Sequence, residues 1–460
     1  MRRLGGAAAI AIAVALAGGL PAGAQTLTDA LIAAYRNSNL LDQNRALLRA
    51  ADEDVAQAVA ALRPVINFVA RAEARSAQVQ NPLAGGTTRQ EDLSAQIALS
   101  GEITVFDFGR NRLAVEASEA QVLATRAALV GLEQRVLLNA VAAFLELRAA
   151  IATLELREAN VRLIDQELQA ARDRFEVGEI TRTDVSIAEA RLAGARSQLA
   201  AAEGDVAVAR EAYLAATGTD AGRPAAPPAL PAIPASLTEA QGVARDRHPA
   251  IRQAQLEVTA ADLNAQRVAA LSRGSVTGSV NLAIDDNRRD QSSVGLSYSR
   301  PLYTGGRNPA LSRQAIAQRD ASRANLHQTT VEVLEEVGIS WSSIAVSRAR
   351  IEASDRQIEA AQTAFEGVSQ EAELGARTTL DVLNAEQELL DARVDRVAAD
   401  TGRTLAVYRL LASMGLMTVD HLGLGIPTYD PEAYFNLVRN APKRSLQGER
   451  LDRVLERLQP

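Results

Sequence analysis

The sequence predicts a mainly helical protein with a small β part, in which one structural plan occurs twice. Three observations predict this fold class. Long stretches carry apolar residues at helical spacing, two pairs of short segments alternate apolar and small polar residues, and one helix–turn–helix sequence returns 197 positions later. Aromatic residues make up 3% of the chain and hydrophobic residues 47%. This composition is typical of long helices that pack through Ala and Leu.

The repeated sequence surrounds Gly178 and reads as a helix end, a tight turn and a new helix start. Gly178 follows the last apolar residue of a long helical pattern, as a glycine at a helix C-terminus does. Thr181 and Asp184 are residues that begin helices. Gly375 and Asp381 hold the places of Gly178 and Asp184 in the second copy. The chain is therefore duplicated.

The N-terminus has the pattern of a secretory signal peptide. Arg2 and Arg3 precede an apolar run that ends at Leu20, and small residues up to Ala24 form a cleavage signature. Cleavage after Ala24 predicts an exported mature protein. The chain has no cysteine, which excludes disulfides and thiolate metal sites. Its net charge of -7 does not support nucleic-acid binding.

Each copy contains a predicted hairpin with strands of about ten residues, the length that a membrane β-strand needs. In the first hairpin Ile66 and Phe68 fall on one face, and Asn67 and Arg71 on the other. A soluble sheet with one wet face gives the same alternation. Four strands cannot close a barrel, and open strand edges are not tolerated in lipid. A membrane location therefore predicts that three copies pool twelve strands above a tunnel of long helices.

The predicted organisation has five parts. These are a signal peptide at 1–24, a first repeat at 25–218 (hairpin about 65–104, tip about 174–186), a proline-rich linker at 219–236, a second repeat at 237–417 (hairpin about 275–302, tip about 371–383), and a polar, partly disordered tail at 418–460. Within the repeats we expect one unbroken helix over 27–62 and another over 237–271, and we assign the extra length of the first hairpin to the loop around 81–86.

From about Thr26 to Leu424 the chain resembles the TolC family of outer-membrane efflux and secretion channels. The resemblance rests on Phe106-Asp-Phe-Gly-Arg110, on Leu302-Tyr-Thr-Gly-Gly-Arg307 and on both tip sequences. It implies a homotrimer with a twelve-stranded barrel in the lipid of the bacterial outer membrane and a helical tunnel in the periplasm. It also implies a periplasmic adaptor (membrane fusion) protein and an inner-membrane transporter of the ABC or RND type as partners. Such proteins are passive conduits for type I secretion or multidrug efflux, so no enzyme activity, catalytic residue, cofactor or metal is expected.

The resemblance also assigns residues at the tips, which close the periplasmic end in this family. Asp381 matches an acidic ring, Arg377 a gate arginine, and Asp184 the acidic partner of that arginine on the other tip. The second acidic position of the family falls on Asn384, and a frequent gate tyrosine falls on Ala372. We therefore expect a single acidic ring and a gate without its tyrosine.

Two apolar–glycine pairs, Val177-Gly178 and Leu374-Gly375, match the family's adaptor-contact motif. Purely structural interpretations remain open for these residues. A carboxylate such as that of Asp381 is stabilised in the first turn of a helix, and glycine is the usual residue of a tight turn. For the whole protein, the alternative is a soluble periplasmic coiled-coil scaffold without a pore, whose hairpins pack on another protein.

Overall fold

The structure, a computed structural model, describes residues 25–81, 86–285 and 290–439. The predicted signal peptide and the end of the tail lie outside the described residues. The chain divides into two units, which we describe separately. The tip unit comprises Met1–Asn37, Asn139–Leu230 and Arg350–Leu405, and the sheet unit comprises Ser38–Leu138, Pro231–Ala349 and Ala406–Pro460.

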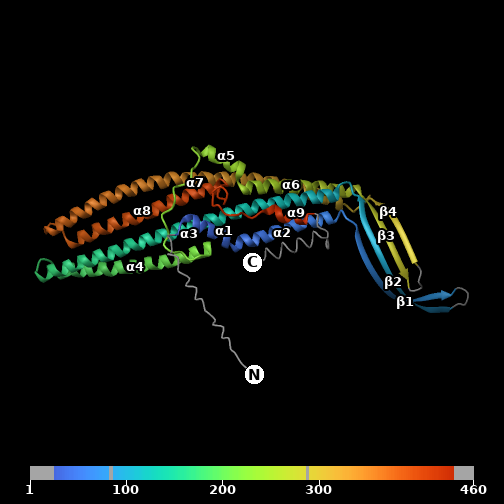
Figure 1. The fold of residues 1–460 in the computed structure, drawn as a ribbon, viewed down its shortest axis with the longest axis horizontal. Coiled ribbons are helices and arrows are strands. Elements are labelled where there is room, and N and C mark those ends of the chain that lie inside the picture. Colours follow the sequence, from blue (N-terminus) through green and yellow to red (C-terminus); the bar gives the residue numbers. More distant parts are fainter. Residues whose placement is uncertain (1–24, 82–85, 286–289, 440–460) are drawn as a thin grey trace, which may run out of the picture. The chain divides into compact units, whose positions relative to one another are not determined.

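The predicted fold class, mainly helical with a small β part, is confirmed (Figure 1). Two helices of 67 residues dominate the chain, α3 (Arg110–Glu176) and α7 (Arg307–Glu373). Each is followed by a returning helix, α4 (Arg182–Thr217) or α8 (Thr379–Ser413). The order of elements in the first half, helix, hairpin, long helix and returning helix, recurs in the second half.

The two stretches expected as single helices are each broken. The first forms α1 (Leu27–Asn37) and α2 (Asn39–Ala60), because the Ser38 hydroxyl accepts a hydrogen bond from the Leu41 N–H and so caps a new helix. The second forms α5 (Leu237–Arg247), α6 (Pro249–Ala269) and the short 3-10 helix Ala270–Arg273. His248 is extended, as a residue before proline usually is, and Pro249 then starts α6.

The four strands form one antiparallel sheet in the order β1 (Val65–Asn81), β2 (Gly86–Phe106), β3 (Ser275–Asp285), β4 (Asp290–Ser299). Paired residues share a face, so the register shows what each face carries. One row joins Phe68, Leu99 and Leu282 and ends at Ser292 of β4, and the next row joins Asn67, Ser100, Asn281 and Ser293. The sheet therefore has one largely apolar face and one largely polar face, and β4 contributes Val294, Leu296 and Tyr298 to the apolar face.

No described element covers the apolar face enough to bury it. Phe68 is 70% exposed and Val294 is 84% exposed, and most other large apolar side chains of the sheet are also exposed. A soluble protein rarely leaves so much continuous apolar surface in water. This sheet needs an apolar environment that the single chain does not provide.

The sheet is four strands wide only where β3 pairs with Gln96–Phe106 of β2, a span of about the ten residues that crosses a bilayer. Beyond Gln96, β1 and β2 continue as a two-stranded ribbon. This ribbon carries ion pairs between Arg75 and Glu73 and between Arg89 and Glu91. The assignment of the extra residues to a loop was therefore wrong, since most of them lengthen the two strands.

The sheet unit also contains a short helix in the tail, α9 (Pro431–Val438), which packs on α2. Tyr434 donates a hydrogen bond of 2.8 Å to Glu53, and the Arg126 guanidinium lies 5.1 Å from the Phe435 ring centre. The described part of the tail is thus more ordered than its polar sequence predicts.

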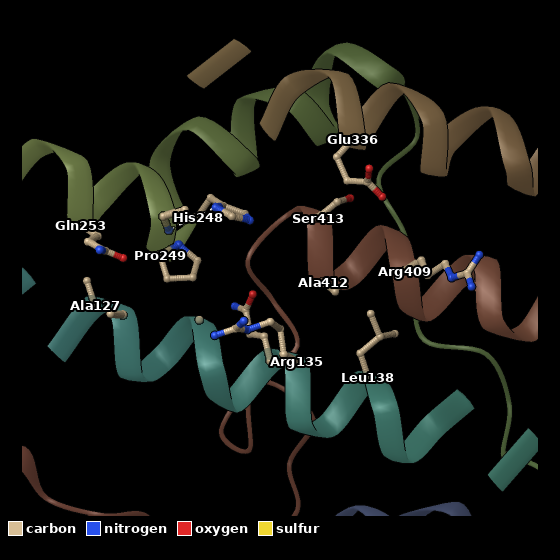
Figure 2. A pocket seen from close by; sticks show the side chains of 14 residues that line it. Ala127, Arg135, Leu138, His248, Pro249, Gln253, Glu336, Arg409, Ala412 and Ser413 are labelled. Atoms are coloured by element: carbon tan, nitrogen blue, oxygen red, sulfur yellow. Dashed lines mark hydrogen bonds between the residues drawn. The ribbon is translucent and has the colours of Figure 1, made fainter. Parts of the chain in front are cut away.

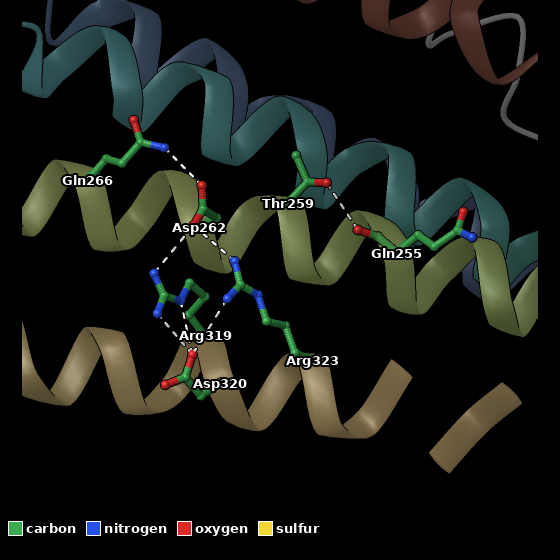
Figure 3. A network of polar contacts seen from close by, with 7 residues as sticks. All are labelled: Gln255, Thr259, Asp262, Gln266, Arg319, Asp320 and Arg323. Atoms are coloured by element: carbon green, nitrogen blue, oxygen red, sulfur yellow. Dashed lines mark hydrogen bonds and ion pairs between the residues drawn. The ribbon is translucent and has the colours of Figure 1, made fainter. Parts of the chain in front are cut away.

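Ion pairs also join α6 to α7 within the sheet unit. Arg319 and Arg323 of α7 each lie 3.8 Å from Asp262 of α6 (Figure 3).

Within the part of the chain that the structure describes, one helix, α3, contains an 18-residue stretch apolar enough to cross a membrane, and 39% of that stretch is buried within the chain. Its side chains Leu137, Val141 and Phe144 are completely buried among other helices. A helix at the centre of a bundle has the same composition, so this stretch is weak evidence for a membrane helix.

Candidate functional site

The two helical tips of the tip unit have the same backbone design. At the first tip Gly178 has φ of +80°, and the N–H groups of Gly178 and Glu179 donate to the carbonyls of Phe175 and Arg174. At the second tip Gly375 has φ of +76°, with equivalent bonds to Ala372 and Glu371. This hydrogen-bond pattern is the Schellman motif, which favours glycine at the left-handed position.

A matched capping box begins the helix after each turn. The Thr378 N–H and hydroxyl donate to Asp381 Oδ2 at 3.0 and 2.8 Å. The Thr181 N–H and hydroxyl donate to Asp184 Oδ2 at 2.9 and 2.8 Å. These hydrogen bonds lower the pKa of both carboxyl groups below the ordinary value, because they stabilise the ionised form. Both aspartates therefore carry their charge at neutral pH.

Arg377 lies in the loop of the second tip, between α7 and α8, where its Nε donates a hydrogen bond to Glu371 Oε2 at 2.8 Å. This bond raises the pKa of Arg377. Among the described residues no ion pair joins Arg377 to Asp184, which was predicted as its partner. The single chain thus ties each of the two residues to its own tip, and their pairing stays a prediction for the assembled protein.

Asn384 connects the two tips. It lies one turn after Asp381 on α8, and its Oδ1 accepts a hydrogen bond of 2.7 Å from Arg191 of α4. Next to Asn384 in the sequence, Leu383 of α8 belongs to an apolar cluster with side chains of α3 and α4, namely Ile164, Leu168, Ala188, Leu192 and Ala195. The tips of the two repeats are therefore packed into one bundle, with Asn384 as a polar link.

The apolar members of the predicted adaptor-contact pairs are the most exposed large apolar side chains of the tips. Val177 is 72% exposed and Leu374 is 86% exposed, each next to the glycine of its turn. An isolated exposed apolar residue needs no explanation, but here the same position is apolar and exposed in both copies. Ala372, at the position of the family tyrosine, is buried.

Sequence reasoning missed two acidic residues in the tip unit. Glu386 of α8 is 4% exposed, and neither of its carboxylate oxygens has a hydrogen-bond partner in the described structure. Burial, with Glu167 of α3 as a second cause, raises the pKa of Glu386 to about 7. Burial also raises the pKa of Glu167. The sequence does show that Glu386 repeats Glu189, but that comparison alone does not reveal which copy is buried.

A second polar region lies in the sheet unit, in a hollow of about 640 Å³ between α3, α6, α7 and α8 (Figure 2). Its lining includes Arg135, Arg409, Glu336 and His248. Burial lowers the pKa of His248, and its Nδ1 accepts the Ala250 N–H at 3.3 Å. The labelled charged groups do not converge on a single point in the hollow. Among the described residues no group of three or more His, Asp or Glu side chains is placed to hold a metal ion.

An uncovered membrane-length sheet, a bundle of very long helices and paired capped tips together define a class, the outer-membrane channels with a helical tunnel. The sequence profile described as "outer membrane efflux protein" matches residues 31–219 and 242–416. The chain belongs to this family.

The relatives extend over most of the chain. The outer membrane efflux protein BepC of Brucella suis is 34% identical over 94% of this chain and 95% of its own length. The outer membrane protein TolC of Vibrio cholerae is 25% identical over 86% of this chain and 92% of its own. The alkaline protease secretion protein AprF of Pseudomonas aeruginosa is 29% identical over 64% of each chain. Relatives therefore include efflux and protease secretion proteins.

Solved structures show the same fold. A crystal structure of CusC superposes with a TM-score of 0.76 and 19% identity over 85% of this chain and 92% of that chain. The channel OprN gives a TM-score of 0.75 and 24% identity over 85% of this chain and 89% of that chain. At these identities the likeness establishes the TolC-like fold. The family resemblance seen in the sequence is confirmed by the sequence profile and by the similarity to BepC.

Proposed function

We propose that the protein is a channel-tunnel that passively conducts substrates from a periplasmic adaptor and an inner-membrane transporter to the cell exterior. The names of its relatives mention efflux and protease secretion, and we propose multidrug efflux and type I protein secretion as the corresponding transport processes. The observation that carries the proposal is the four-stranded sheet with one uncovered apolar face and one polar face. In a membrane wall the apolar face contacts lipid and the polar face lines water.

The proposed assembly is a homotrimer, because one sheet of four strands leaves β1 and β4 as open edges. Unpaired strand edges are not tolerated in lipid, and three copies supply twelve strands. Cleavage of the predicted signal peptide after Ala24 would deliver the chain to the periplasm, where the helical tunnel would remain. The partner classes proposed are an adaptor protein and an ABC or RND-type transporter, with no nucleic acid.

We assign the tips as the periplasmic gate and docking end. Three copies of Asp381 would form the acidic ring, with Asn384 one turn further along, and Arg377 and Asp184 would latch neighbouring tips. Val177-Gly178 and Leu374-Gly375 would contact the adaptor. The exposure of Val177 and Leu374 and the ionised state of Asp381 support these roles.

The test separates the channel from the alternative, a soluble periplasmic scaffold. Cells expressing the full chain are fractionated, and the protein purified in detergent is added to planar lipid bilayers. We expect heat-modifiable trimers in the outer-membrane fraction and discrete conductance steps. A monomer that is stable without detergent in the periplasmic extract would contradict the proposal. The uncovered apolar face argues against that outcome.

A further inference from the structure

Glu386 occupies a position of α8 where the packing requires an apolar side chain. It lies on the same helix stripe as Leu383, Leu389 and Leu390, which are all buried. Leu383 packs against Ile164 of α3. A carboxylate without partners in such a place is costly when ionised, because no hydrogen bond replaces the water that it loses. The neutral acid can stay in the stripe at much lower cost.

The charged groups around Glu386 do not compensate for its burial. From α3, Glu167 faces it and disfavours ionisation, and Glu167 itself lies near Arg174 and, from α7, near Glu373. Two charged side chains of the first turns of α4 bond to other residues. Glu189 pairs with Arg172 at 2.8 Å, and Arg191 bonds Asn384 at 2.7 Å.

The two repeats differ at this site in one partner residue. Glu189 is the copy of Glu386 in the first repeat, 197 positions earlier, and it is exposed and paired with Arg172. The position equivalent to Arg172 in the second repeat is Ser369, which cannot form an ion pair. The acidic residue is thus present in both copies, whereas its cationic partner exists in only one.

We propose that Glu386 is a proton-binding site that makes the tip bundle respond to pH: bound to a proton it packs α8 against α3, and ionised opposite Glu167 it favours separation of the two helices. The proposed proton-binding site is inferred from the geometry of the tip unit alone. Its consequence, a channel that opens more readily at higher pH, rests on the proposed function.

The direction and size of the response follow from the pKa. The closed bundle raises the pKa of Glu386 from 4.5 to about 7. The stabilisation of the closed state is therefore largest below pH 4.5, and it is lost as the pH rises toward and through 7. Between pH 6 and pH 8 this difference predicts a roughly tenfold increase in the opening equilibrium of α8.

Hydrogen exchange of the full-length protein in detergent tests the proposal. Exchange of backbone amides in the first three turns of α8 is measured at pH 6 and pH 8 and corrected for intrinsic rates. We expect the opening constant to rise about tenfold in the wild type and to stay constant in Glu386→Gln. The matched control Glu189→Gln, which changes the paired copy of the same residue, should behave as the wild type. An equal response of Glu386→Gln and wild type would overturn the proposal.

A second variant leaves Glu386 in place and supplies the missing partner. Ser369→Arg recreates the arrangement of Arg172 and Glu189, so it should keep Glu386 ionised and reduce the pH response to less than about twofold. A full tenfold response in this variant would also overturn the proposal. Conductance is recorded in parallel at both pH values. Loss of all conductance with the exchange results intact would contradict the proposed channel and leave the proton site established.

Discussion

At the scale of residues, the duplication provides a matched control for some of the tip side chains, among them Asp381 and Glu386. Asp184 and Asp381 each accept the same hydrogen bonds from the threonine three positions earlier, and this hydrogen bonding lowers the pKa of both carboxyl groups. Their local structural roles are therefore equal, and only Asp381 is proposed to line the pore. A difference between the two substitutions would measure that role separately from helix capping.

The first prediction concerns the acidic ring. Replacing Asp381 by Asn removes three negative charges from the proposed trimer constriction and should lower the cation preference of the pore and weaken its block by multivalent cations. Reversal potentials in planar bilayers under a salt gradient measure the preference. Asp184→Asn disturbs the same kind of capping box. It also removes the proposed latch partner of Arg377, so it should raise conductance but leave selectivity unchanged. Unchanged selectivity in Asp381→Asn would remove the ring assignment.

The second prediction concerns the latch. Arg377→Ser should raise single-channel conductance, because it removes the proposed inter-tip ion pair. Glu371→Gln is the control, since it removes the negative charge that Arg377 pairs with in its own turn. If Arg377 acts only by bracing that turn, both variants will have the same conductance. No change in Arg377→Ser would identify it as an ordinary surface charge.

At the scale of elements, the sequence predicted the class of each element better than its breaks and lengths. Helical periodicity over many turns indicates α3 and α7, because each turn adds to the same pattern. The break at Ser38 depends on one hydroxyl that caps a helix, and serine also occurs inside helices. The outer part of the extension of β1 and β2 beyond Gln96 depends on pairing of residues 86–91 of β2 with β1, and this polar segment contains no large apolar residue that would show an alternation.

The same limit applies to the candidate site. A capping box can be predicted from neighbouring residues, so the positions of Asp184 and Asp381 at helix starts were accessible from the sequence. The burial of Glu386 depends on α3 and α8, whose facing residues lie more than 200 positions apart in the chain. No local pattern reports such a contact. In the sequence, only the comparison of the two copies indicates that Glu386 differs from Glu189, because Ser369 stands where the first copy has Arg172.

The third prediction concerns α2 and the docked helix α9. Asp52 of α2 is completely buried and neither of its carboxylate oxygens has a hydrogen-bond partner in the described structure, so its pKa rises from 3.8 to about 6. The folded state thus favours the protonated acid, and this stabilisation is lost as the pH rises from about 4 to above 6. Asp52→Asn should stabilise the protein by roughly 1–3 kcal/mol at pH 8 and by much less at pH 4.

Thermal unfolding followed by circular dichroism at the two pH values measures this difference. Asp42→Asn is the control, because Asp42 lies on the same helix in an exposed ion pair with Arg45. Surface pairs of this kind contribute little to stability. An equal melting shift of Asp52→Asn at pH 4 and pH 8 would show that the ionisation of Asp52 has no part in the effect.

At the scale of the whole molecule, the open edges of the sheet are the feature that a single chain cannot resolve. The order β1-β2-β3-β4 leaves β1 and β4 unpaired on their outer sides. Within one chain these two edges are three strand spacings apart, roughly 14 Å. A disulfide requires Cα atoms within about 7 Å. A direct β1–β4 disulfide can therefore form only between different copies of the chain.

This geometry gives the last prediction. Because the chain contains no cysteine, any disulfide that forms must involve the introduced residues. Asn67→Cys in β1 is combined in turn with Gln291→Cys, Ser293→Cys or Ser297→Cys in β4, all at polar-face positions of the register. If neighbouring copies complete the wall, at least one pair should give covalent trimers on oxidation in outer membranes, as resolved on denaturing gels. Each single variant should stay monomeric on the same gels, because its cysteines lie on only one of the two edges that meet. Failure of all three pairs, with the protein present in the outer membrane, would mean that the sheet edges are covered by something other than a second copy.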